Sequence, residues 1–172
     1  MTPTRVLFLC TGNSARSILA AAMLNHLGQG RFTAYSAGSQ PAGRIHPGAL
    51  RELARQGIDA DGLRSKSWDE FTAPDAPAID LVVTVCDSAA AEPCPAFFGD
   101  FARIHWGLPD PAHVAGNEAV VDEAFRRTAA VIRDRLQAVV ALPAGLPRAE
   151  LQQAVHAIES RFPAQPLAGA DA

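Results

Sequence analysis

The chain has 172 residues, of which 48% are hydrophobic and 19% charged, the ordinary composition of a globular protein. A chain of this length buries about two-thirds of its unfolded surface in one core, so a single domain suffices. The formal net charge of −3 excludes the chain-wide positive field by which proteins bind nucleic acids or anionic membranes.

The first segment, MTPTRVLFLC, is apolar but does not have the features of a targeting signal. Its apolar run of four residues is shorter than the roughly 7 to 15 residues that a secretory signal requires. No segment reaches the roughly 18 apolar residues of a transmembrane helix. We therefore expect a cytoplasmic protein that acts neither on a membrane nor on nucleic acid.

Residues 5–9 form the first predicted strand, and a Gly/Ser loop separates it from an Ala/Leu-rich helix. We expect that helix over residues 17–27, with Gly28 and Gly30 ending it. A second strand is predicted at residues 32–37. It is followed by a helix that Pro47 opens and that runs to Arg55.

The second half of the chain continues this alternation. Residues 80–85 form the most apolar strand candidate, typical of a strand covered on both faces, and residues 101–106 form the next. A shorter amphipathic helix, Arg148–Arg161, and a Pro/Ala/Gly tail end the chain. The longest predicted helix, Glu118–Val140, carries side chains of its inner face at steps of three and four residues: Val121, Phe125, Thr128, Ile132, Leu136 and Val139.

The alternation of strands and helices predicts an α/β fold of three layers, in which helices cover both faces of a four-stranded, mainly parallel sheet. We expect one domain over residues 1–142 and a C-terminal extension, residues 143–172, made of the short helix and a flexible tail. Ligands of such sheets bind at the carboxyl ends of the strands, where the loops into the helices begin.

The loop after the first strand, CTGNSARS at residues 10–17, has the features of an anion site. A loop that enters a helix N-terminus directs backbone N–H groups and the positive end of the helix dipole toward one point. Gly12 permits a tight turn, and Asn13 tolerates a left-handed conformation while its side chain bonds the loop to itself. The guanidinium of Arg16 suits two oxygens of a phosphate-like anion. The residues expected to bind this oxyanion are Thr11, Gly12, Asn13, Ser14, Ala15 and Arg16.

Cys10 lies at the floor of this loop, facing its N–H groups, Arg16 and the hydroxyl of Ser17. These groups stabilise a thiolate, so we expect the pKa of Cys10 to lie well below its reference value of about 8.5. A thiolate beneath a bound oxyanion is a nucleophile directed at the central atom. A nucleotide-binding loop of the Walker type is excluded, because no Gly-Lys-Ser/Thr follows Gly12.

Several ordered motifs resemble two related families of one fold, the low-molecular-weight protein tyrosine phosphatases and the arsenate reductases built on that scaffold. They are CTGNSARS at 10–17, SAG at 36–38, HPGAL at 46–50, GID at 57–59 and HWGLPDPA at 105–112, and the resemblance covers residues 4–142. It implies a phosphatase-like fold and a covalent adduct on Cys10. It also implies that Asp110, between two prolines, is the general acid for the leaving oxygen. An Asp that caps a turn is the alternative interpretation.

The two families differ in the group that resolves the adduct, which is water in the phosphatases and a second thiol in the reductases. Cys86 follows the predicted strand at 80–85, and Cys94 follows a stretch of small residues. The resemblance implies that Cys86 attacks Cys10 bearing the arsenic adduct and releases arsenite. Cys94 would then attack Cys86 and carry the disulfide to the surface for thioredoxin. Inert packing of both thiols, or a reductase linked to glutaredoxin or glutathione, are the alternatives.

The resemblance therefore implies an arsenate reductase for arsenic detoxification with residual phosphatase activity, without a cofactor, and with phosphate or sulfate as competing oxyanions. No aromatic residue follows Asp110-Pro111-Ala112, and Tyr35 is the only tyrosine, which favours a small inorganic substrate over phosphotyrosine. A phosphate-monoester phosphatase and a non-catalytic oxyanion-binding module stay open as alternatives. The five histidines show no metal-ligand spacing, so no metal site is expected.

Overall fold

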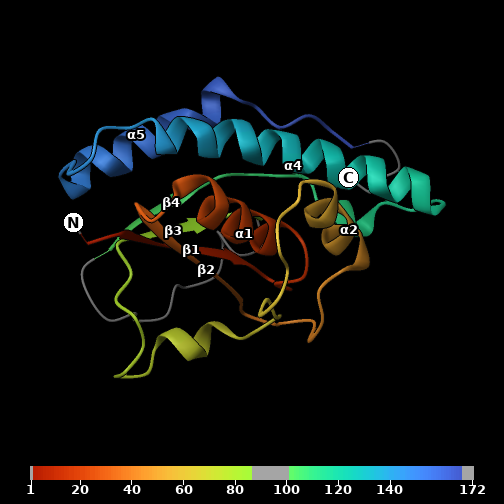
Figure 1. Cartoon of the computed structure of the whole chain (residues 1–172), viewed down its shortest axis with the longest axis horizontal. Coiled ribbons are helices and arrows are strands. Elements are labelled where there is room, and N and C mark those ends of the chain that lie inside the picture. Colours follow the sequence, from red (N-terminus) through yellow and green to blue (C-terminus); the bar gives the residue numbers. More distant parts are fainter. Residues whose placement is uncertain (1, 87–100, 168–172) are drawn as a thin grey trace.

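The computed structural model describes residues 2–86 and 101–167, so Cys94 and its predicted part in the relay lie outside the described residues. Four parallel strands form one sheet in the order β2-β1-β3-β4 (Figure 1). The strands are β1 (Thr4–Cys10), β2 (Phe32–Gly38), β3 (Leu81–Thr84) and β4 (Ala102–His105). The predicted α/β fold with a parallel sheet is confirmed, and every strand lies where the sequence places it.

The helices also lie at the predicted positions. They are α1 (Arg16–Gly28), α2 (Pro47–Arg55), α4 (Glu118–Val140) and α5 (Arg148–Arg161), with short 3-10 turns η1 (Trp68–Phe71) and η2 (Pro111–His113). Among the residues that the structure describes, no helix has the length and apolar character needed to cross a membrane.

Helix boundaries follow from local backbone chemistry. Pro47 is the first residue of α2, as predicted, and the ring Nδ1 of His46 accepts a hydrogen bond from Gly48 N (2.9 Å). The helix α1 runs one residue past its predicted end. Its stop falls on two residues of left-handed backbone, Gln29 (φ 46°) and Gly30 (φ 87°).

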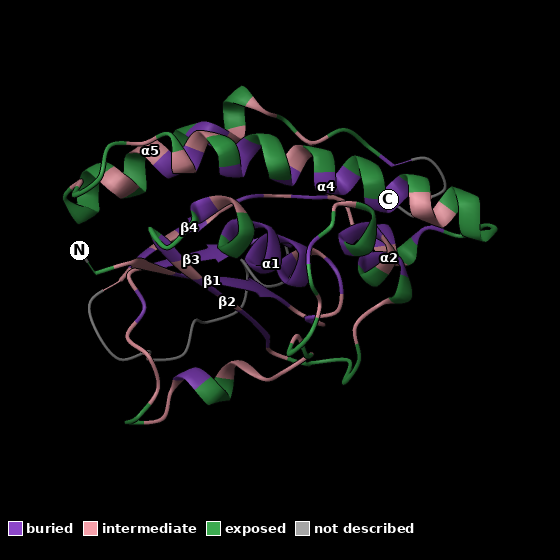
Figure 2. Ribbon diagram, viewed as in Figure 1, coloured by how far each residue is buried: buried purple, intermediate pink, exposed green. Residues whose placement is uncertain are grey.

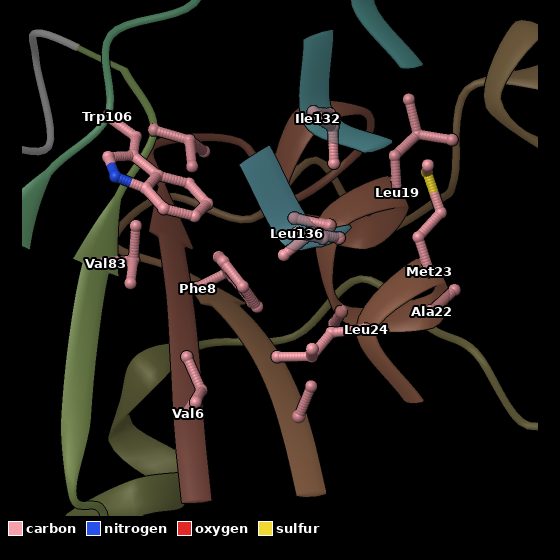
Figure 3. Packing of buried hydrophobic residues seen from close by; sticks show 14 of the residues in the cluster. Val6, Phe8, Leu19, Ala22, Met23, Leu24, Val83, Trp106, Ile132 and Leu136 are labelled. Atoms are coloured by element: carbon pink, nitrogen blue, oxygen red, sulfur yellow. The ribbon is translucent and has the colours of Figure 1, made fainter. Parts of the chain in front are cut away.

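The main core lies between one face of the sheet and the helices α1, α4 and α5. Figure 3 shows Phe8 of β1 between Trp106 and Leu136, and the rings of Phe8 and Trp106 have centroids 6.5 Å apart. In Figure 2 the buried residues of α4 face the sheet, whereas its exposed residues face outward. The apolar repeat of the sequence therefore marks the face by which α4 packs.

A smaller cluster covers the opposite face of the sheet. Leu7, Leu9 and Val82 point to this side, where Phe71 of η1 and Ile79 pack on them. The alternation of side chains along β1 explains the division, because Val6 and Phe8 belong to the main core. Both faces of the central strand are buried, as its continuous apolar sequence indicates.

The segment after residue 142 packs on the domain. Val155 and Ile158 of α5 are buried in the main core, and the indole Nε1 of Trp106 donates to the carbonyl of Val155 (2.9 Å). Beyond α5 the chain runs back along α4 (Figure 1). There Leu167 is buried against Val114 and Ala124. The end of the described chain thus lies close to the loop that follows β4.

Candidate active site

The loop between β1 and α1 is held from outside by the backbone of residues 40–46. Three of its carbonyl groups accept hydrogen bonds from that segment and so point away from the space beneath the loop. The bonds run from Gln40 N to Thr11 O (2.9 Å), from Ala42 N to Gly12 O (2.8 Å) and from His46 N to Ser14 O (2.9 Å). With these carbonyls directed outward, the N–H side of the loop is left for an anion, as at other helix N-termini.

The side chain of Asn13 holds the loop in its conformation through hydrogen bonds. Its backbone is left-handed, as predicted, with φ 46°, and its side chain is fully buried. The amide Nδ2 donates to the hydroxyl of Ser17 (2.8 Å), and Oδ1 accepts from Lys66 N (2.8 Å). The side chain thus bonds the loop to itself, as expected from the sequence, and the part of Asn13 in oxyanion binding stays a prediction.

Gly38, the last residue of the SAG motif, lets the end of β2 touch the same loop. A Cβ atom at this position would lie 2.4 Å from the carbonyl oxygen of Thr11 and 2.8 Å from that of Cys10. Both neighbours are backbone atoms that cannot turn aside. The glycine therefore fixes how closely the loop can pack on the sheet.

Cys10 lies at the floor of the loop, buried and surrounded by hydrogen-bonding groups. Its Sγ is 2.9 Å from the hydroxyl of Ser17 and accepts a bond from Asn13 N (3.2 Å). Burial raises the pKa of Cys10, and the opposing effects of Ser17 and Arg16 are smaller. The prediction of a strongly lowered pKa is therefore wrong, because the loss of hydration outweighs the nearby donors.

The side chain of Arg16 contacts the loop after β4. Its Nη1 donates to the carbonyl of Leu108 (2.8 Å), and its Nη2 lies 3.2 Å from the carboxylate of Asp110. The guanidinium therefore pairs with an opposite charge across the pocket. This contact brings together the two charged residues that the motifs single out, across 94 residues of sequence.

Asp110 fits both interpretations considered from the sequence. Its Oδ1 accepts from Ala112 N (2.9 Å), so the residue caps the 3-10 turn η2. Its Oδ2 faces Arg16 and lies 3.6 Å from His113 Nε2. The cap fixes the carboxylate at the edge of the pocket, where a general acid is needed.

Cys86 lies beside the loop between β1 and α1 (residues 10–17, here called the oxyanion loop), as its position after β3 predicts. Its Sγ accepts a hydrogen bond from Thr11 N (3.3 Å) and is 3.6 Å from the Thr11 hydroxyl. Thr11 directly follows Cys10, so the second sulfur contacts the residue next to the first. Both thiols are buried. The parallel register explains the meeting, because β1 and β3 are neighbours whose carboxyl ends lie at one edge of the sheet.

These groups surround an open pocket of about 1060 Å³. Its wall includes both cysteines, Arg16 and Asp110, and also residues that the sequence did not indicate. The unexpected ones are Ala42, then His113 from the loop after β4, and Ala164, Pro166 and Leu167 from the C-terminal extension. His113 follows a matched motif and could have been suspected. The tail residues carry no local signal, since only tertiary packing brings them here.

The chain is similar to known proteins over most of its length. A model of the low molecular weight phosphotyrosine protein phosphatase family matches residues 5–156. An arsenate reductase of Halalkalibacterium halodurans is 37% identical over 133 residues, which are 77% of this chain and 91% of that protein. A solved arsenate reductase of Archaeoglobus fulgidus is 31% identical with a TM-score of 0.61, over 80% of this chain and 99% of its own. A thioredoxin-dependent arsenate reductase of Corynebacterium glutamicum is 26% identical with a TM-score of 0.56, over 78% of this chain and 61% of its own.

Proposed function

The chain belongs to the low molecular weight phosphotyrosine protein phosphatase family, and we propose that within it the chain is an arsenate reductase. One observation carries the proposal. The Cys86 sulfur contacts Thr11, the residue that follows the nucleophile Cys10. A phosphatase needs a single thiol at this place, whereas a reductase needs a second one that can reach the first.

The first step is attack by Cys10 on the arsenic of bound arsenate. A sulfur–arsenic bond forms and an arsenic–oxygen bond breaks. The proton lost by the thiol balances the one that Asp110 delivers to the leaving oxygen, which departs as water. Arg16 turns from Leu108 and Asp110 to two oxygens of the anion, where its planar guanidinium fits best. The loop N–H groups stabilise the charge that accumulates on the remaining oxygens.

The second step transfers the electrons. Cys86, as the thiolate, attacks the Cys10 sulfur, so that a disulfide forms and the sulfur–arsenic bond breaks. The bonding pair stays on arsenic, which is reduced from As(V) to As(III), while the two sulfurs are oxidised by two electrons in total. The proton from the Cys86 thiol and one from solvent complete the arsenous acid that leaves.

The enzyme must then recover its thiols. We propose that Cys94 attacks Cys86, which frees Cys10 and leaves a Cys86–Cys94 disulfide for an external dithiol. Thioredoxin is the proposed reductant, as in the similar protein of Corynebacterium glutamicum, with glutaredoxin or glutathione as the alternative. Phosphate and sulfate compete for the loop because they share the charge and tetrahedral shape of arsenate.

A coupled assay tests the proposal. Wild-type protein with thioredoxin, thioredoxin reductase and NADPH should consume NADPH when arsenate is added. Cys86→Ser should abolish this turnover but keep phosphate binding, because the loop itself is unchanged. Turnover that survives in Cys86→Ser would refute the relay.

The rival function is hydrolysis of phosphate monoesters, which the family and the open pocket favour. It predicts that wild type and the Cys86→Ser/Cys94→Ser variant hydrolyse p-nitrophenyl phosphate equally and that neither responds to arsenate. A non-catalytic binding module predicts phosphate binding that persists in Asp110→Asn, with no product under any reductant. Both outcomes differ from the arsenate-dependent NADPH consumption expected here.

A further inference from the structure

The backbone of Gly107, at the start of the loop that carries Asp110, is hydrogen-bonded to a side chain at its N–H and to another at its C=O. Gly107 N donates to the carboxylate of Glu159 on α5 (2.6 Å). Gly107 O accepts from the guanidinium Nη1 of Arg135 on α4 (3.3 Å). The two helices, which pack outside the sheet, therefore fix the two consecutive peptide groups on either side of the Gly107 Cα. Hydrogen bonds to charged partners are about twice as strong as neutral ones.

Arg135 is itself firmly placed. Its side chain is almost completely buried, and its guanidinium lies over the Trp106 ring, 5.8 Å from the centroid. Its Nε donates to the carbonyl of Phe162, directly after α5 (3.0 Å). The same guanidinium thus ties the loop after β4 to the segment that continues to the pocket wall at Ala164.

A displacement of the Gly107 backbone would also displace the groups next to it that act in the proposed reaction. Leu108, the next residue, supplies the carbonyl that binds Arg16, and Asp110 follows two residues later. Pro109 and Pro111 restrict the backbone between them, so the short segment moves largely as a unit. The Asp110 carboxylate therefore depends on how well the Gly107 peptide is held.

We infer that Glu159 is a positioning residue for the general acid, and that the C-terminal extension is thereby part of the catalytic apparatus. Glu159 lies beyond the family match, which ends at residue 156. The inference rests on the proposed function, since Asp110 has its acid role there. If the inference holds, full activity requires Glu159 in addition to the oxyanion loop and the three cysteines.

A purely structural role would be to hold α5 on the sheet. That task has other contacts, because Val155 and Ile158 are buried and Trp106 Nε1 bonds to the carbonyl of Val155. Loss of Glu159 should therefore leave α5 docked while the Gly107 peptide loosens. The two roles make different predictions for catalysis.

The test compares steady-state arsenate reduction by Glu159→Ala and by Glu150→Ala, an exposed control on the same helix. Glu159→Ala should lower kcat about 10-fold, since a small misplacement of a catalytic group is costly, and change KM less than about twofold. Glu150→Ala should match wild type. Glu159→Gln, which keeps an acceptor for Gly107 N, should restore most of kcat. Should Glu159→Ala fail to fold, Glu159→Asp takes its place, because it withdraws the acceptor and keeps the charge.

A double-mutant cycle separates positioning from folding. In an Asp110→Asn background, Glu159→Ala should lower kcat much less than in the wild-type background, because the general acid that it positions is gone. An equal loss in both backgrounds would overturn the inference and leave the reductase proposal intact. Absence of turnover in wild type would instead defeat the proposed function.

A measurement independent of turnover decides the structural part. Hydrogen exchange in peptides covering residues 107–110 should become at least about threefold faster in Glu159→Ala, with exchange at residues 10–17 unchanged. Unchanged exchange at 107–110 would overturn the inference whatever the protein catalyses.

Discussion

The reactive sulfur of Cys10 combines two opposing influences. Asn13 N donates a hydrogen bond to it and the hydroxyl of Ser17 lies 2.9 Å away, which favours a thiolate, yet burial raises its pKa above the ordinary value. The residues of this site could be predicted from the sequence, because motif and spacing identify Cys10, Arg16 and Asp110. The direction of the pKa shift could not, because it depends on how much water the fold removes from around Cys10.

The raised pKa predicts a specific pH dependence. In a Cys86→Ser/Cys94→Ser variant without anion, alkylation of Cys10 by iodoacetamide should still be accelerating above pH about 8.5. Because the folded state holds the thiol proton more tightly than the unfolded state, Cys10 contributes less to stability as pH rises above its unfolded pKa. A rate that reaches its plateau by neutral pH would contradict the prediction.

Asn13 combines local and distant contacts. Its left-handed backbone and its bond to Ser17 within the loop were predictable from the sequence, but its bond to Lys66 N joins residues 53 positions apart. Asn13→Ala should cost about 1 to 3 kcal/mol in the free energy of unfolding and also lower activity. Asn25→Ala is the control, since Asn25 bonds in the same manner to both backbone groups of Ala34, away from the pocket.

Chemical denaturation and the coupled assay would measure the two variants. Loss of stability in both, with loss of activity confined to Asn13→Ala, would support the bracing role. Equal activity in the two variants would show that the loop keeps its shape without Asn13.

At the scale of elements, most of the fold was accessible from the sequence. All four strands and four α-helices of the described residues were predicted, because the hydrophobic period, Pro47 and the glycines after α1 and α2 are local signals. The order of strands in the sheet and the approach of β2 to the oxyanion loop are not local. They depend on close contacts such as those of Gly38 with Thr11 and Cys10.

Alanine substitutions at two glycines distinguish a change in the shape of the oxyanion loop from a general loss of packing. A Cβ at Gly38 would overlap the loop backbone, and one at Gly48 of α2 would lie 2.5 Å from the Phe125 ring of α4. Both Gly38→Ala and Gly48→Ala should destabilise the protein by about 1 to 3 kcal/mol. Titration calorimetry should find that phosphate binds more weakly to Gly38→Ala than to wild type, whereas Gly48→Ala should bind phosphate as wild type does. Similar affinities in the two variants would mean that the contact of β2 does not shape the loop.

At the scale of the whole molecule, the pocket is assembled from distant parts of the chain. Its wall joins the first loop, the end of β3, the loop after β4 and the last described residues, 164–167. The sequence indicated the first three, because parallel strands end at one edge of the sheet. It gave no sign of the last, because residues of a tail are placed only by the surface on which they pack.

Anion binding should therefore stabilise the entire domain. A ligand that binds only the folded state at 100 times its Kd adds about 2.7 kcal/mol to the free energy of unfolding. Phosphate should raise Tm by several degrees in a concentration-dependent manner in wild type, but much less in Arg16→Ala. An equal rise in both proteins would show that phosphate acts elsewhere than at Arg16.

The most direct test of the account is to treat fully reduced protein with arsenate, without any other reductant, and to map its disulfides by mass spectrometry. One arsenite should be released per chain, and a disulfide should form that joins Cys86 to Cys10 or, after exchange, to Cys94. Release of arsenite should disappear in Cys86→Ser. Cysteines that all stay reduced after exposure to arsenate, in a protein that still binds the anion, would contradict it.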